Sequence, residues 1–183
     1  MAQNQNIFEP LSGFAGLQAI LDNREERVTR QREMLRQYAS PLVSFTVNMP
    51  GASKNNIAAL RIFREGMKSV ERLIAGNGWA VLAQRRHSSP AGPEALACVQ
   101  AAPYDLKRAM LLLEENHPLG RLFDFDVLTP EGRGISRARF GKPMRSCFLC
   151  GNPAALCARE QKHSLEALQN HIRELLLPFP PCE

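Results

Sequence analysis

The chain has 183 residues, of which 44% are hydrophobic and 22% are charged, and its formal net charge is +5. This length and composition suit one globular domain, residues 1–183, because the chain is long enough and apolar enough to bury a hydrophobic core. Because residues 1–6 carry no targeting signal and no apolar run is long enough to span a bilayer, we expect a cytoplasmic protein without membrane contact.

The first part of the chain predicts two helices separated by a strand. Apolar residues recur at helical spacing over 16–38, and the β-branched run 42–47 predicts a strand that ends at a Pro-Gly turn. A second helix follows, with Ser53 or Asn55 as its cap and Gly76 past its end.

The turn between this strand and this helix is Pro50-Gly51-Ala52-Ser53-Lys54. Free amides and the dipole at a helix N-terminus can bind phosphate, and Lys54 would add positive charge. The full P-loop pattern is absent, so an ordinary turn remains the alternative.

The middle of the chain predicts strands over 79–86 and 94–101, then a helix over 104–115 that ends before His117. Because imidazole titrates near neutral pH and His117 directly precedes the next predicted strand, it is a candidate general base. The alternative is a histidine that only ends the helix.

The last part predicts a hairpin of strands 122–128 and 134–140 and a closing helix over 165–175. Strands joined both by helices and by hairpins favour an α+β fold with a mixed, largely antiparallel sheet flanked by helices. No internal repeat or interdomain linker is visible in the sequence.

A pair of acidic residues carries the chemistry of the first hairpin strand. Alternation places Phe123, Phe125 and Val127 on one face and Asp124 and Asp126 on the other. Two carboxylates so close together can share one Mg²⁺, which is usually completed by substrate phosphates. The pattern therefore indicates phosphoryl or nucleotidyl transfer, and the alternative is an exposed, solvated pair.

Arginines surround this pair in the sequence. Arg121 directly precedes the strand, and a block without acids follows it, so these cations are candidates for binding phosphates or an acidic partner protein. The block contains Arg133, Arg137, Arg139, Lys142 and Arg145.

The chain has five cysteines, an odd number that argues against a disulfide framework. Cys147-x2-Cys150 followed by Cys157 and His163 predicts a structural zinc site within a C-terminal subregion, residues 147–177. The alternative is a set of reduced, buried cysteines, with His163 capping the closing helix. The remaining two cysteines are Cys98 and Cys182. We expect one of them in the core and the other as a free thiol.

Several motifs together resemble one family. The segment 117–127, His-Pro-Leu-Gly-Arg-Leu-Phe-Asp-Phe-Asp-Val, is similar to the signature of citrate lyase holo-acyl-carrier-protein synthases, the apo-citrate lyase phosphoribosyl-dephospho-coenzyme A transferases. Also similar are 41–46, 134–137, and 145–150 running to 157–159. The resemblance covers nearly the whole chain.

This resemblance implies transfer of triphosphoribosyl-dephospho-coenzyme A to a serine of the apo acyl carrier (gamma) subunit of citrate lyase, with release of diphosphate. It also implies a nucleotidyltransferase-like fold, in which Gly120 and the aspartate pair form the site. Two departures stand out: Arg121 replaces the usual small hydroxyl residue, and 134–140 contains no third carboxylate. Asp105 and Glu131 are the candidates to supply it.

The alternative from another class of function is a small zinc-containing module that binds nucleic acid or has a regulatory role. It would be built on the cysteine cluster and the basic block. It leaves Asp124 and Asp126 unexplained, since acids in a phosphate-binding face weaken nucleic-acid binding. The chain also has only one Trp and two Tyr for base stacking. We therefore expect no nucleic-acid partner.

Overall fold

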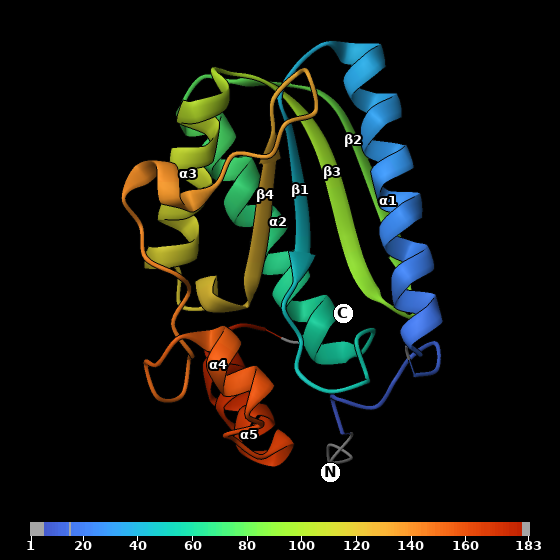
Figure 1. The fold of residues 1–183 in the computed structure, drawn as a ribbon, viewed down its shortest axis with the longest axis vertical. Coiled ribbons are helices and arrows are strands. Elements are labelled where there is room, and N and C mark those ends of the chain that lie inside the picture. Colours follow the sequence, from blue (N-terminus) through green and yellow to red (C-terminus); the bar gives the residue numbers. More distant parts are fainter. Residues whose placement is uncertain (1–5, 15, 181–183) are drawn as a thin grey trace.

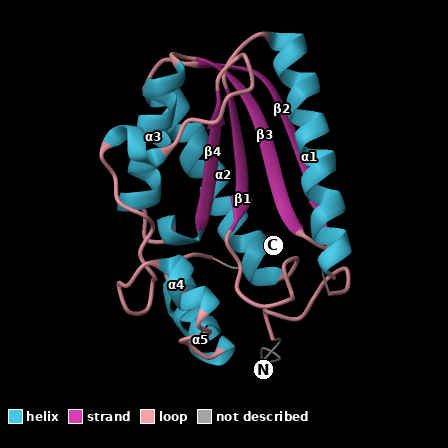
Figure 2. Cartoon of the chain, in the orientation of Figure 1, coloured by secondary structure: helices cyan, strands magenta, loops and turns pink. Residues whose placement is uncertain are grey.

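A computed structural model describes residues 6–14 and 16–180. Its centre is a four-stranded sheet in the order β2-β3-β1-β4, with helices on both faces (Figures 1 and 2). Every pairing in this sheet is antiparallel. The strands are β1 (Leu42–Val47), β2 (Ala80–Ser89), β3 (Gly92–Gln100) and β4 (Phe123–Leu128).

The helices account for the rest of the α+β architecture, which confirms the predicted fold class. They are α1 (Leu17–Tyr38), α2 (Ile57–Gly76), α3 (Pro103–Asn116), α4 (Ala154–Arg159) and α5 (Leu165–Leu176), together with the 3-10 turns η1 (Gly120–Leu122) and η2 (Arg137–Phe140). None of the helices in the described ranges is long and apolar enough to cross a membrane. The predicted cytoplasmic location stays a prediction.

The first strand of the chain, β1, lies inside the sheet and pairs on both sides. Leu42 is opposite Cys98 of β3 and opposite Leu128 of β4. Its β-branched and aromatic sequence, Leu-Val-Ser-Phe-Thr-Val, suits a strand that is buried along most of its length. β4 therefore extends the sheet at one edge, beside β1.

The two faces of the sheet differ in their cover. The aromatic side chains of β4 and β1, Phe123, Phe125 and Phe45, pack against α2 and α3 in the main core. On the opposite face, α1 covers a smaller cluster that includes Met34 and Leu96. Figure 1 shows that α1 lies over the β2–β3 side, so the face of β4 that carries the acids is left open beside it.

Asn56 begins the second helix, which corrects the predicted caps Ser53 and Asn55. The Asn56 side chain accepts a hydrogen bond from the Ala59 amide at 2.8 Å and donates to the Ser53 carbonyl. Gly76 is the last residue of α2 rather than the residue after it.

The predicted strand 134–140 is wrong. Its first residues touch β4 only briefly, through a bridge between Leu128 and Gly134 and a bond from the Ile135 amide to the Val127 carbonyl. The chain then turns into η2, because the Ser136 side chain caps the Ala138 amide. Arg137 and Arg139, which fall within the predicted strand, therefore lie on a 3-10 turn.

The C-terminal part packs below the sheet as a helical subregion (Figure 1). The short helix α4 was not predicted, whereas the closing helix was, and Ser164 caps it. Ile172 and Leu176 of α5 are fully buried in the main core. Arg61 of α2 donates to the Leu176 carbonyl at 2.9 Å, which fixes the end of α5. Cys182 lies outside the described residues.

Candidate functional site

The aspartate pair lies on the open face of β4, as alternation predicts. Asp124 is opposite Thr46 of β1, and Asp126 is opposite Ser44. Both carboxylates reach solvent, and the Asp124 side chain is 49% exposed. Phe123 and Phe125, which alternate with them, are buried on the other side, and this holds the strand in one register.

Arg145 joins the basic segment after β4 to this pair. Its Nη1 contacts the Asp124 carboxylate at 2.9 Å, and its Nη2 donates to the carbonyls of Phe123 and Arg121. Thr46 Oγ1 lies 3.4 Å from the same carboxylate. The structure therefore places Arg145 beside Asp124, 21 residues earlier in the chain. The predicted role of Arg145 in substrate binding stays a prediction.

The pKa of the Asp126 carboxyl is raised above its usual value. Neighbouring protein atoms remove part of its hydration, and the negative charge of Asp124 adds to the effect, while Lys107, Arg27 and Arg145 oppose it. Such mutual repulsion between carboxylates favours binding of a proton or a cation.

Two buried residues of α3, which sequence reasoning missed, hold the free edge of β4. Glu114 accepts the Phe125 amide at 3.0 Å, and Lys107 donates to the Phe125 carbonyl at 2.7 Å. Burial raises the pKa of Glu114 and lowers that of Lys107. Because Phe125 separates the two aspartates, these bonds fix the backbone that carries both.

A third carboxylate on the same face also went unnoticed. Glu94 of β3 is opposite Thr46, which is in turn opposite Asp124, so the three lie in one row across the sheet. Glu94 is buried and pairs with Arg27 at 2.8 Å and with Arg30 at 2.6 Å. Arg27 and Arg30 of α1 therefore neutralise the charge of Glu94. Glu94 and Asp124 lie on the two strands that flank β1, and adjacent strands are only about 4.8 Å apart.

The acids that we considered as a third ligand lie elsewhere. Asp105 is on the exposed side of α3, paired with Arg108 at 2.9 Å. Glu131 is in the turn after β4, where hydrogen bonds to Thr129 and to its own backbone lower its pKa. The row across the sheet was not visible in the sequence, because periodicity does not give strand order.

The remaining cationic candidates have different surroundings. Arg137 lies near Glu114 and Glu115, with nitrogen-to-oxygen distances of 3.7 and 3.6 Å. The Arg121 guanidinium makes no hydrogen bond to any described residue, and its Nε is buried. Burial and the charges of Arg145 and Arg137 lower the pKa of Arg121. Arg137 therefore lies beside two carboxylates, whereas Arg121 forms no ion pair with a described residue.

Gly120 has a steric role at the start of this strand. A Cβ at this position would lie 2.5 Å from the carbonyl oxygens of Leu113 and Glu114, so only glycine lets η1 pack on the end of α3. Its amide already donates to the His117 carbonyl at 2.8 Å. The predicted role of Gly120 in substrate binding stays a prediction.

His117 lies on the far side of β4 from the aspartates. Its ring is 4.9 Å from that of Phe123 and 5.7 Å from that of Phe179, and its Nδ1 accepts the Leu119 amide. Burial lowers its pKa. The structure does not bring His117 to the pair, and its role as a general base stays a prediction.

Lys54 precedes α2 by three residues and is not at its first turn. The amides of Ala58 and Ala59 are already bonded to the Ile7 carbonyl and to Asn56. These two amides are therefore not free to bind phosphate, and the predicted role of Lys54 in phosphate binding stays a prediction. Lys54 itself donates to the Met49 carbonyl and lines a cavity that also contains Arg121.

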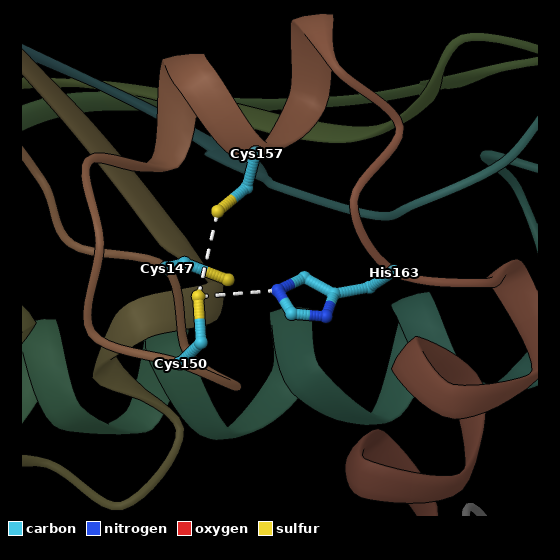
Figure 3. Close-up of side chains that lie close together, drawn as sticks. All are labelled: Cys147, Cys150, Cys157 and His163. Atoms are coloured by element: carbon cyan, nitrogen blue, oxygen red, sulfur yellow. Dashed lines mark hydrogen bonds between the residues drawn. The ribbon is translucent and has the colours of Figure 1, made fainter.

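The cysteine cluster forms as predicted. The ligand atoms of Cys147, Cys150, Cys157 and His163 all lie within 4.8 Å of one another, and Figure 3 shows the four side chains pointing to one centre. Cys150 Sγ is 3.5 Å from Cys157 Sγ and 3.2 Å from His163 Nε2. This is a Cys3His set that could hold a metal ion. His163 belongs to it and does not cap α5.

The local backbone shapes the turn after Cys150 and lowers the pKa of its thiol. Gly151, with φ of +72°, allows the sharp turn after Cys150. The pKa of Cys150 is lowered to about 6, chiefly by the Asn152 amide and then by His163 and the other cysteines. The pKa of Cys157 is raised to about 11 by burial and by the neighbouring thiols.

Comparison with known proteins decides the family. A family model described as apo-citrate lyase phosphoribosyl-dephospho-CoA transferase matches residues 15–179. Curated proteins of that name from Escherichia coli O139:H28 and O8 are 44% identical over 163 residues, covering 89% of each chain. One from Shigella boydii serotype 18 is 43% identical over the same length. The chain belongs to this family.

Membership in the apo-citrate lyase phosphoribosyl-dephospho-CoA transferases confirms the resemblance seen in the sequence, and the matched range contains both the aspartate pair and the cysteine cluster. A nucleic-acid-binding module is not favoured. The likeness to nucleotidyltransferase folds stays a prediction.

Proposed function

We propose that this protein transfers a phosphoribosyl-dephospho-CoA group from its triphosphate precursor to a serine of the apo acyl carrier (gamma) subunit of citrate lyase. The serine oxygen forms a bond to the α-phosphorus, the bond between the α-phosphorus and the bridging oxygen to the β-phosphorus breaks, diphosphate leaves, and the serine proton passes to solvent or a base. The observation that carries this proposal is the exposed aspartate pair on β4 of a family member.

Asp124 and Asp126 fit a Mg²⁺ ion, because both are solvent-accessible oxygen ligands on one face and the pKa of Asp126 is raised beside Asp124. When bound, Mg²⁺ neutralises charge on the transferring phosphoryl group. Arg145 orients Asp124 and adds positive charge at the same place. The protein therefore supplies position and electrostatic stabilisation.

The other arginines support binding of the phosphates. The Nε of Arg121 and two nitrogens of Arg137 make no hydrogen bond within the described residues, which leaves these guanidinium groups with donors for oxygens of a substrate. Lys54 binds a substrate phosphate as well, and the backbone at Gly120 lies close to that phosphate. The basic segment that contains Arg137 would face an acidic carrier. His117 is a less favoured candidate for the base.

The cysteine cluster suits zinc. Tetrahedral zinc with bonds of about 2.3 Å to sulfur places two sulfurs about 3.8 Å apart, close to the 3.5 Å between Cys150 and Cys157. Four protein ligands leave no open position, so zinc here would be structural. It would tie the segment before α4 to the segment before α5.

The deciding experiment mixes the protein with apo carrier, the triphosphate precursor and Mg²⁺, and measures the intact mass of the carrier. We expect a mass gain equal to one phosphoribosyl-dephospho-CoA group. Asp124→Asn and Asp126→Asn should each slow the transfer by at least about 100-fold, in line with the loss of a charge-stabilising group. Asp105→Asn, on the exposed side of α3, is the matched control and should keep wild-type activity.

An unmodified carrier with a verified precursor would contradict the function. Wild-type rates in both β4 variants would contradict the metal site alone.

A further inference from the structure

A cavity lies where the loop after β1 meets the C-terminal subregion. Its volume is about 640 Å³, within the range of small-molecule sites. The loop and α5 are in direct contact at its rim, since a Cβ at Gly51 would lie 2.9 Å from Leu165 Cδ1. Cys147, Cys157 and His163 of the metal-binding cluster form part of its wall.

Outside the metal-binding cluster, the charged side chains of this cavity are positive. Lys54 and Arg121 line it, and no acidic residue is among its described lining residues. Lys54 donates only to a backbone carbonyl, and the Arg121 guanidinium has no hydrogen-bond partner in the described part of the chain. Two cations without a carboxylate partner favour an anionic ligand.

The other half of the lining is uncharged and largely apolar. Met49, Phe148, Leu165 and Leu168 contribute to it, and Phe148 is held by stacking on His171 at 5.6 Å. Inorganic phosphate or diphosphate would leave this half empty. The lining thus fits a ligand that combines an anionic group with a long uncharged part.

The cavity adjoins the aspartate pair. Arg145 contacts Asp124 and also the backbone carbonyl of Arg121, whose side chain lines the cavity. Two residues after Arg145, Cys147 lies in the cavity wall. The cavity is thus linked to the Asp124 carboxylate through Arg121 and Arg145.

We infer that this cavity binds the dephospho-coenzyme A part of the donor, while the triphosphate lies at Asp124 and Asp126. The diphosphate of that part pairs with Lys54 and Arg121, and its uncharged arm packs against Leu165 and Leu168. This inference rests on the proposed function. It also makes the Cys3His cluster one wall of the donor site, so that metal loading shapes donor binding.

The test measures binding of dephospho-coenzyme A alone to the metal-loaded protein by calorimetry, without Mg²⁺. Lys54→Ala should weaken binding at least about tenfold, the usual value of a charge-assisted contact. Leu168→Trp should abolish it by filling the cavity. The matched controls are Lys162→Ala and Leu112→Trp, which change exposed residues outside the lining. Equal affinity in the wild type and all four variants, or no binding to the wild type, would overturn the inference.

A kinetic measurement separates this inference from the proposed function. In the carrier assay, Leu168→Trp should raise KM for the donor at least about tenfold with little change in kcat. An unchanged KM in a variant with wild-type Tm overturns the inference and leaves the function standing. Failure of the wild type to modify the carrier refutes the function, and dephospho-coenzyme A binding is then judged by calorimetry alone.

Discussion

Asp124 and Asp126 have different partners although they share one face of β4. Arg145 and Thr46 contact Asp124, whereas Asp126 makes no side-chain hydrogen bond to any described residue. Its raised pKa, caused by lost hydration and by Asp124, means that its charge destabilises the metal-free protein. A cation bound at Asp126 would therefore relieve a penalty that its charge imposes on the folded protein.

Asp126→Asn should stabilise the metal-free protein at pH 7 while it abolishes transfer. A carboxyl whose pKa is raised by folding lowers stability once it ionises, so the penalty appears as pH rises above the ordinary pKa and is complete above the raised value. We expect a rise in Tm of up to about 3 °C at pH 7, since charge interactions at exposed sites reach about 1 kcal/mol.

Thermal melts between pH 3 and pH 8 check this, with Asp105→Asn as the control. The difference between Asp126→Asn and the wild type should vanish at the acidic end. Mg²⁺ should raise Tm of the wild type and of Asp105→Asn but not of Asp126→Asn. A lower Tm for Asp126→Asn across the range would contradict it.

At the scale of elements, β4 is an edge strand whose free side is filled by side chains. The Phe125 amide donates to the Glu114 side chain, and the Phe125 carbonyl accepts from the Lys107 side chain. The Ile135 amide donates to the Val127 carbonyl. An edge strand normally leaves such groups to water or to another chain. Here α3 replaces the missing neighbour, so the backbone between the aspartates is held on both sides.

Lys107→Met should destabilise the protein by about 1–3 kcal/mol, because it leaves the buried Phe125 carbonyl without a donor. Urea unfolding measures the change, and the transfer rate should fall as well because the aspartates lose their fixed spacing. Lys162→Met, an exposed lysine, is the control and should change stability by less than about 0.5 kcal/mol. Equal stability of the two variants would show that Lys107 does not support β4.

Local patterns predicted what depends on local chemistry. Alternation placed Asp124 and Asp126 on one face, and cysteine spacing predicted the metal-binding set. Strand 134–140 failed because the Ser136 cap and the acids of α3, which attract Arg137, outweigh a weak strand tendency. Lys107 and Glu94 could not be predicted, since their roles depend on which helix and which strand become neighbours of β4.

For the whole molecule, contacts at both ends of the C-terminal subregion link it to the sheet and its helices. Arg145, just before this subregion, contacts Asp124, and Ile172 of α5 is buried in the main core. Between these contacts, the segment 147–163 contains the cysteine cluster and the short helix α4, and Phe148 packs against the main core. A metal ion would therefore supply much of the order there.

Removal of this metal should lower Tm by at least about 5 °C, the equivalent of a few kcal/mol for a chain of this size. Mass spectrometry of metals should find about one zinc per chain in the wild type and much less in Cys157→Ser. Cys98→Ala changes a buried cysteine of β3 outside the cluster and should keep full zinc content. Equal zinc in the three proteins, or none in the wild type, would refute a structural zinc site.

The position of β1 has a consequence for how the protein is made. This strand is completed at residue 47, but its partners end at residues 100 and 128, so it stays without neighbours while the ribosome adds many further residues. Pairings between distant segments are slow, because loop closure costs entropy before contacts form. β4, which carries the aspartate pair, is the last strand of the sheet to be synthesised, so the pair can take its place beside β1 only after residue 128 has been added.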